Sequence, residues 1–148
     1  MSFANATPGP RHSLTDETKP AAIIEGDGCW PDVDPGIARI VTRLNGTVTN
    51  ERLVEALQNA IQHIDAELED WRAKQTEDLT AKQKGLYLRA VYFSAKADLT
   101  ERYRDFDTTA EGARRVEDLS EAIDSARRNV RWAVHDLLQR SRTIVEAL

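Results

Sequence analysis

The residue types that most often carry chemistry are sparse in this chain. Three histidines, His12, His63 and His135, are its candidate metal ligands and its candidate general bases near neutral pH. Dinuclear metal sites in helical bundles use Glu-x-x-His pairs, but Ala60 stands three residues before His63 and Trp132 three residues before His135. Because this pattern is absent, we expect no bound metal and ordinary surface or half-buried histidines.

Nucleophilic catalysis has no candidate residue either. The sequence contains no glycine-rich phosphate loop and no Gly-x-Ser-x-Gly turn, and its single cysteine, Cys29, has no plausible base. Adjacent acids, such as Glu69-Asp70 and Glu77-Asp78, are more typical of solvated helix faces than of general acid-base pairs. We therefore expect neither an enzyme nor a cofactor.

The arginines in the last third of the chain are harder to interpret. The set comprises Arg114, Arg115, Arg127, Arg128 and Arg131. Asp124 lies four residues before Arg128, and intrahelical ion pairs of this kind would explain part of the set. Glu111 stands in a similar position three residues before Arg114. The favoured interpretation is solvated or intrahelical pairing, and the alternative is pairing across a subunit interface, where arginine is enriched.

Composition favours a single all-α domain. The chain has 148 residues and a mass of 16.6 kDa, which suits one modest core. Only 6% of its residues are aromatic while 30% are charged, and this balance favours long solvated helices over a sandwich or a wound parallel sheet.

The charge distribution argues against a broad nucleic-acid footprint. The net charge is −5, and residues 1–35 hold −4 of it because they carry six acids against two bases. Residues 109–142 have seven arginines against six acids and are nearly neutral. Nucleic-acid partners usually select a strongly basic face. An acidic chain of this kind would let DNA slide past rather than grip it.

No feature of the sequence indicates export or membrane insertion. A lone cysteine cannot form an internal disulfide, so nothing marks an oxidising compartment. The N-terminus lacks the basic and apolar regions of a signal peptide, and no apolar run approaches the roughly 18 residues that a spanning helix needs. We expect a soluble, unexported protein without a membrane partner.

The first half of the chain divides into an arm and two helices. Residues 1–29 are rich in proline and small polar residues and are interpreted as a flexible N-terminal arm. Trp30 is the first expected anchor, and residues 37–41 predict a short helix. Thr49 is a good N-cap for a long helix whose apolar stripe runs from Leu53 to Trp71.

Two further long helices are predicted in the second half. One begins near Lys82 or just after Gly85 and stops near Asp105; the next follows a reciprocal cap in which Thr108 and Glu111 satisfy each other's backbone donors. Short connections predict antiparallel neighbours. We therefore expect a bundle of three long antiparallel helices over residues 30–140, preceded by the short helix and followed by a C-terminal tail at 141–148. Tyr103 and Trp132 are expected more often in the core than at an interface.

Several blocks between residues 30 and 148 agree, in order, with one family pattern. They are Trp30-Pro31, Arg43-Leu-Asn-Gly-Thr-Val-Thr49, Arg52-Leu53, Tyr87-Leu-Arg-Ala-Val-Tyr92, Ala95, Ala97, Leu99, Glu101-Arg-Tyr-Arg-Asp105, Asp107-Thr-Thr109, Glu111-Gly112, Arg127-Arg128, Arg131-Trp-Ala133, Asp136 and Arg142-Thr-Ile-Val-Glu146. Through these blocks the chain resembles the head completion protein family (GpL type) of temperate contractile-tailed bacteriophages.

This resemblance implies a head-to-tail connector in the neck of the virion. Subunits made in the host cytoplasm would join the portal protein at one capsid vertex after DNA packaging, help to retain the genome and provide the surface where the tail docks. The tail-side partner would be a tail-terminator or tail-completion protein. The family also implies a ring of about twelve copies, which requires an interface that closes by rotation. DNA would pass through that ring without sequence-specific binding.

The resemblance and the residues together assign provisional roles. We expect the subunit interface to use Arg114, Arg115, Arg127, Arg128 and Arg131. We expect the portal contact to use Arg142, Thr143, Ile144, Val145 and Glu146. Structural roles are expected for Trp30, Thr49, Tyr103, Thr108, Glu111 and Trp132. The alternative is a helical DNA-binding module that uses the arginines of the last helix.

Overall fold

The computed structural model describes residues 20–106 and 112–139, and the side chains of residues 20–104 and 115–139. Four helices make up this part of the chain: α1 (Pro35–Thr42), α2 (Asn50–Ala73), α3 (Ala81–Phe106) and α4 (Gly112–Leu137). The one pairing of extended backbone in the described ranges is an isolated antiparallel bridge between Ile24 and Val33. The predicted all-α class is confirmed.

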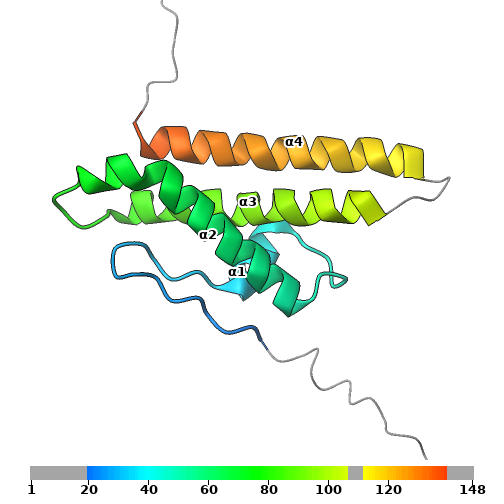
Figure 1. Ribbon diagram of the computed structural model, residues 1–148, viewed down its shortest axis with the longest axis horizontal. Helices are drawn as coiled ribbons and strands as arrows, with labels where there is room; N and C mark the ends of the chain where they lie inside the picture. Colours follow the sequence, from blue (N-terminus) through cyan, green and yellow to red (C-terminus); the bar gives the residue numbers. More distant parts are fainter. Residues whose placement is uncertain (1–19, 107–111, 140–148) are drawn as a thin grey trace, which may run out of the picture.

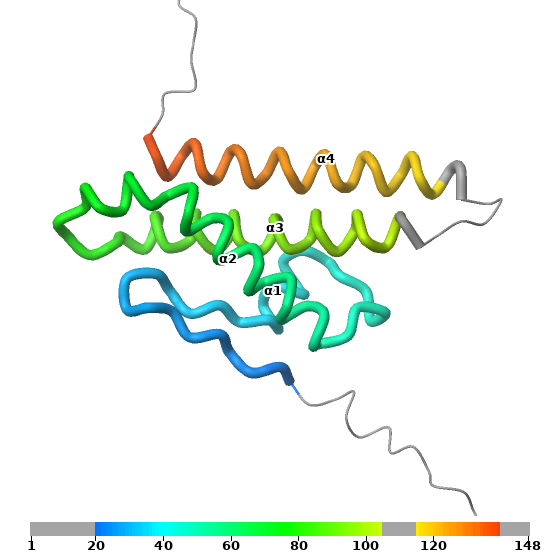
Figure 2. Tube along the Cα trace, viewed as in Figure 1, coloured from blue at the N-terminus to red at the C-terminus, as the bar shows by residue number. Residues whose placement is uncertain are grey.

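Helix α3 lies at the centre of the molecule. Figure 1 shows α4 running antiparallel along one side of α3, while α2 crosses over α3 obliquely, in front of it in this view. The short helix α1 contacts both α2 and α3. The trace in Figure 2 shows the segment before α1 folded back on itself, on the side of α3 away from α4. Helix α3 therefore lies between α4 on one side and α1 with the N-terminal segment on the other, and α2 crosses over it.

Local capping sets the first two helix starts. The Asp34 carboxylate accepts hydrogen bonds from the amides of Gly36 at 2.8 Å and Ile37 at 3.3 Å, and Pro35 at the first position of α1 needs no amide partner. Arg43 ends α1 in the left-handed region with φ of 53°. Thr49 caps α2 because its hydroxyl oxygen accepts from the Arg52 amide at 3.3 Å.

A large part of the core lies where the second half of α2 meets the start of α3 and the end of α4. Its largest fully buried side chains include Ile64 and Leu68 of α2, Tyr87 and Val91 of α3, and Leu137 of α4. They belong to one buried cluster. We call this region the closed end of the α3–α4 pair.

Residues 20–29 take part in the fold, although the sequence favours assigning them to the arm. Ile24 and Val33 exchange two backbone hydrogen bonds of 2.9 and 2.8 Å, which turns the chain back on itself. The Asp27 carboxylate accepts from the amides of Trp30 and Cys29, and these bonds hold the pKa of Asp27 below its usual range. This turn delivers the indole of Trp30 to the core.

Trp30 closes the core with an aromatic stack. Its ring centroid lies 4.2 Å from that of Tyr87 and 6.4 Å from that of Trp71, both in stacked geometry. The Arg72 guanidinium lies 5.3 Å from the Trp30 centroid. Since stacked rings contribute beyond their buried area, this cluster ties the N-terminal segment to α2 and α3.

A polar pair sits beside the aromatic stack. The Tyr87 hydroxyl donates a 2.7 Å hydrogen bond to Oδ1 of Asp65. Burial raises the pKa of the Asp65 carboxyl, and the bond from Tyr87 only partly opposes that rise. The pKa of Tyr87 is raised well above its usual range by burial and by this carboxylate.

The opposite end of the α3–α4 pair is less covered, and we call it the open end. Leu119 of α4 is only half-buried, and the buried residues described in α4 begin at Ile123. Tyr103 of α3 is 54% exposed. The cause is the oblique course of α2, which leaves α3 before this end (Figure 1).

Candidate functional site

The residue types that could bind a metal or act in catalysis do not form a cluster in the described part of the chain. Within residues 20–106 and 112–139, no group of three or more His, Cys, Asp or Glu side chains is placed to hold a metal ion. His63 and His135 are exposed, and His12 lies outside these residues. The features that could carry a function are therefore the surfaces of the described part of the chain.

The arginines of α4 are divided among different surroundings. Nη2 of Arg127 lies 2.7 Å from Oε2 of Glu101, so this arginine joins α4 to α3 within one chain. Arg128 lies over the ring of Trp132, 5.5 Å from its centroid. Arg131 and Arg115 are exposed, and the side chain of Arg114 is outside the described set. The interface role predicted for these arginines stays a prediction.

Trp132 projects from the solvent face of α4. Helical spacing places it away from the side that buries Ala133, Val134 and Leu137, and it is 47% exposed. Tyr103 is 54% exposed, so the core position favoured for both residues by type is wrong: among the described helices, none covers either side chain. Arg128 and Trp132 form a compact aromatic and cationic feature on the outer face of α4.

A charged groove separates α2 from α4 above α3. Its volume is about 370 Å³, and its walls carry acids and bases from three helices. The acids and bases that line it are Glu67, Asp98, Glu101, Arg127 and Arg131, and His63 lies beside them. Ser94 and Ala97 also line the groove. Because these side chains are small, the groove has room for a side chain of a partner.

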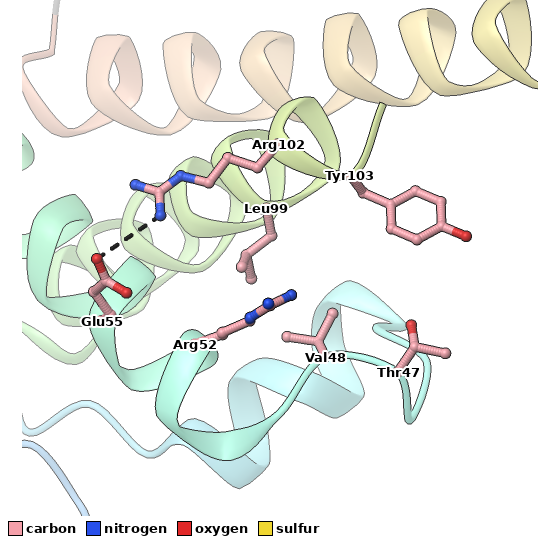
Figure 3. A pocket seen from close by; sticks show the side chains of 7 residues that line it. All are labelled: Thr47, Val48, Arg52, Glu55, Leu99, Arg102 and Tyr103. Atoms are coloured by element: carbon pink, nitrogen blue, oxygen red, sulfur yellow. Dashed lines mark ion pairs between the residues drawn. The ribbon is translucent and has the colours of Figure 1, made fainter. Parts of the chain in front are cut away.

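A second hollow marks the open end (Figure 3). It has a volume of about 390 Å³ and is lined by Thr47, Val48, Arg52, Glu55, Leu99, Arg102 and Tyr103. The Arg102 guanidinium pairs with Glu55 at 3.8 Å and with Asp98 at 3.3 Å. Arg52 extends from the start of α2 into the space between Val48 and Tyr103 (Figure 3).

Arg39 holds the loop between α1 and α2, which forms one wall of this hollow. Its guanidinium donates to the carbonyls of Asn45 at 3.0 Å and Val48 at 2.8 Å, and to Oδ1 of Asn50 at 3.1 Å. A single fixed fork of donors thus ties α1, the loop and α2 together. The role of Arg39 could not be found from spacing, since its partners lie in an irregular loop.

Helix α1 presents an unusual face to solvent. It buries Pro35, Ala38 and Thr42, which are its smaller residues. Its larger apolar residues point the other way: Ile37, Ile40 and Val41 are 50%, 78% and 46% exposed. An amphipathic helix normally buries its large apolar stripe. Exposed apolar stripes rimmed by polar residues often mark interaction surfaces.

The sequence contained a signal for this α1 stripe. Ile37, Ile40 and Val41 have the spacing of one helix face, which predicts a contact surface. That spacing does not reveal whether the contact lies within the chain or outside it. The exposed surfaces of Tyr103 and Arg52 carried no comparable signal.

Several predicted residues lie outside the described set. The reciprocal cap of Thr108 and Glu111 falls between α3 and α4, and the run from Arg142 to Glu146 follows residue 139. Across the described residues, no helix combines the length and apolar character needed to cross a membrane.

Comparison with known proteins identifies relatives over most of the chain. Residues 24–85 and 78–148 match the phage head completion protein (GPL) family. The chain is 31% identical over 140 residues to the head completion/stabilization protein of Escherichia phage P2, covering 85% of this chain and 83% of that protein. Among solved structures, none matches.

The family match spans the N-terminal segment, all four helices and the region after α4. The relative from phage P2 extends over a similar share of both proteins. The predicted resemblance is confirmed, and the chain belongs to the phage head completion protein (GPL) family.

Proposed function

We propose that this protein is a head-to-tail connector that binds the portal vertex after DNA packaging, helps to retain the genome and provides the surface where the tail docks. The observation that carries the proposal is the family match from residue 24 to residue 148. The name of the phage P2 relative, a head completion/stabilization protein, supports the same role. We place the protein in the virion neck, after assembly from the host cytoplasm.

The described surfaces suit a connector better than a catalyst. The family is a structural one rather than a known enzyme class. Long helices with exposed charged and apolar faces offer several separate contacts to other proteins. We propose a ring of about twelve copies that matches the portal, contacts a tail-terminator or tail-completion protein and lets DNA pass without sequence-specific binding. No substrate is transformed in this proposal.

The C-terminal tail is our candidate portal contact. The run from Arg142 to Glu146 includes the apolar pair Ile144-Val145, which is too short to make a core of its own. Deletion of residues 141–148 should abolish co-sedimentation of the full chain with purified portal rings. Replacing Ile144 and Val145 together by aspartate should have the same effect at full length, whereas Ala147→Ser should bind normally. Undiminished binding of the deletion variant would exclude this contact.

The functional role itself can be tested in the virion. Phage that lack this gene product should package DNA but release it, and should produce separate heads and tails. These outcomes are measured by nuclease sensitivity of the packaged genome and by electron microscopy of lysates. Normal genome retention together with normal tail attachment would exclude the proposed function.

DNA binding through α4 is the weaker candidate. It needs the arginines on one accessible face, but Arg127 is engaged by Glu101 and Arg128 lies over Trp132. The net charge of −5 opposes it as well. A duplex mobility assay at low salt should show no shift, because phosphate binding is strongest there. A salt-sensitive shift that Arg128→Ala and Arg131→Ala reduce would support this alternative.

A further inference from the structure

We infer that two surfaces on opposite sides of the molecule form one contact between neighbouring copies. The first, the α1 edge, consists of Ile37, Ile40 and Val41 together with the acidic segment 20–34. The second, the α4 edge, consists of Arg128, Arg131 and Trp132. This inference rests on the proposed function, because a connector ring is where copies of this chain would meet side by side.

The positions of the two edges fit a contact between different faces. Figure 1 shows α4 on one side of α3, with α1 and the N-terminal segment on the other. Helices α4 and α1 each pack on α3, so their outer faces point away from the body. A closed ring needs two different surfaces on every subunit, both usable at once. Surfaces on opposite sides of α3 satisfy that requirement.

The apolar parts of the two edges complement each other. Ile40 is 78% exposed, more than Ile37 or Val41 in the same α1 stripe. Trp132 is the exposed large hydrophobic residue of the described part of α4. Tryptophan and arginine are both enriched among the anchor residues of protein interfaces. Such an anchor fits a stripe of branched aliphatic side chains, which the α1 edge provides.

The charges of the two edges are opposite. Residues 20–41, which span the α1 edge, contain four acids and one base, Arg39, whose guanidinium is engaged by the loop before α2. Residues 125–135, in the second half of α4, contain three arginines and no acid. Opposite potentials of this kind set the orientation of an interface and exclude wrong pairings. They favour contact between the α1 edge of one copy and the α4 edge of the next, and they oppose contact between two like edges.

The acids of the α1 edge are already held in place. Asp27, Asp32 and Asp34 accept backbone hydrogen bonds from residues 26–37, at distances between 2.7 and 3.3 Å, while Glu25 is exposed. Fixed carboxylates lose little freedom when a partner binds. On the other edge, Arg127 is neutralised by Glu101, but Arg131 has no ion pair with any described side chain. Arg128 and Arg131 are therefore the cations that a neighbouring copy would meet.

Two complementary variants test this contact. Ile40→Asp disables only the α1 edge, and Arg128→Glu with Arg131→Glu disables only the α4 edge. Each should weaken self-association about 30-fold or more, the equivalent of losing one interface hot spot. Mixed together, the two variants retain one working pair of edges and should form dimers that grow no further. Sedimentation velocity distinguishes these dimers from the larger wild-type assemblies.

Matched controls use the open end. Tyr103→Ser removes an exposed aromatic residue, and Arg52→Glu reverses an exposed arginine, but neither lies on an edge. Both should assemble like the wild type, and all variants should keep the wild-type circular dichroism spectrum. Wild-type assembly by Ile40→Asp, or failure of the mixture to form dimers, would overturn the inference.

Cross-linking on portal rings covers the case in which free chains do not associate. In a Cys29→Ser background, Ile40→Cys with Arg131→Cys should give a ladder of covalent multimers, whereas Tyr103→Cys with Arg131→Cys should not. Binding to the portal without a ladder would overturn the inferred contact between the α1 and α4 edges and leave the proposed function intact. If the chain fails to bind the portal, the proposed function fails, and the same cross-linking of the concentrated free chain then decides whether the edges meet.

Discussion

The closed and open ends of the α3–α4 pair are made from the same two helices but are packed differently. At the closed end, Tyr87 and Leu137 are 1% exposed and share a cluster with Leu68 of α2. At the open end, Tyr103 is 54% exposed and Leu119 is half-buried. The difference follows from α2, which covers one end and crosses away from the other (Figure 1).

This contrast separates stability from contact with partners. Large apolar and aromatic side chains are fully buried at the closed end, and their burial stabilises the fold. The open end and the outer faces of α1 and α4 leave apolar groups accessible at little cost to the body. Substitutions at the closed end should therefore affect folding first, and substitutions at exposed positions should affect assembly first.

The largest expected effect compares two tryptophans. Trp30→Ala removes the centre of the aromatic stack and should lower the free energy of unfolding by about 3–5 kcal/mol. Trp132→Ala, at an exposed position, should lower it by less than about 1 kcal/mol, chiefly through the lost contact with Arg128. Urea denaturation followed by circular dichroism measures both. Equal losses would contradict the division between the two regions.

A pair of leucines sharpens the comparison within the body. Leu68→Ala at the closed end should cost about 2–5 kcal/mol, because a fully buried side chain leaves a cavity. Leu119→Ala at the open end should cost less than about 1.5 kcal/mol, because this side chain is only half-buried. The same urea titrations test the pair. A larger loss at Leu119 would show that α4 is anchored at the open end instead.

The pH dependence of stability tests the polar pair beside the aromatic stack. Burial raises the pKa of Asp65 above its ordinary value of 3.8, so the folded state binds this proton more tightly than the unfolded chain does. Wild-type stability should therefore fall as pH rises from that value through the folded pKa. Asp65→Asn cannot titrate, so its stability relative to wild type should increase over this window and then level off. Urea midpoints of both proteins are measured near pH 4 and near pH 7. If the difference between the variant and the wild type is the same at both pH values, this account is excluded.

The smallest expected effect concerns the ion pair between Glu101 and Arg127. These side chains are partly exposed, and Arg127→Gln should cost less than about 1 kcal/mol. Because solvent ions screen exposed pairs, the loss should shrink further at roughly 1 M salt. A double-mutant cycle with Glu101→Gln isolates the pair. A coupling of several kcal/mol would mean that charge, and not burial, holds α4 on α3 near the open end.

The helices themselves were largely predictable from the sequence. The stripe from Leu53 to Trp71 and the cap at Thr49 indicate α2 nearly as it stands, since both signals act within a few residues. The pairing of Ile24 with Val33 was not predictable. This pairing brings Trp30 into contact with Tyr87, which lies far away along the chain, and no local pattern indicates that contact.

The candidate surfaces were likewise predictable only in part. The spacing of Ile37, Ile40 and Val41 predicts one apolar face, and the arginines of α4 are evident from composition. Neither pattern says which face is covered. Arg127 and Glu101 are 26 residues apart and meet only because α4 folds back along α3. The exposure of Trp132 likewise depends on how the described helices pack, because α2 and α3 both lie away from its side of α4.

By itself, the sequence determined the helical class, the helix cores and the family, because periodicity, caps and short motifs are local properties of the chain. Only the tertiary structure decided that α2 crosses α3 obliquely, and hence which end of the α3–α4 pair is covered. That crossing depends on how side chains from distant segments interlock, and no local pattern encodes it. The surfaces left accessible are the consequence of that packing.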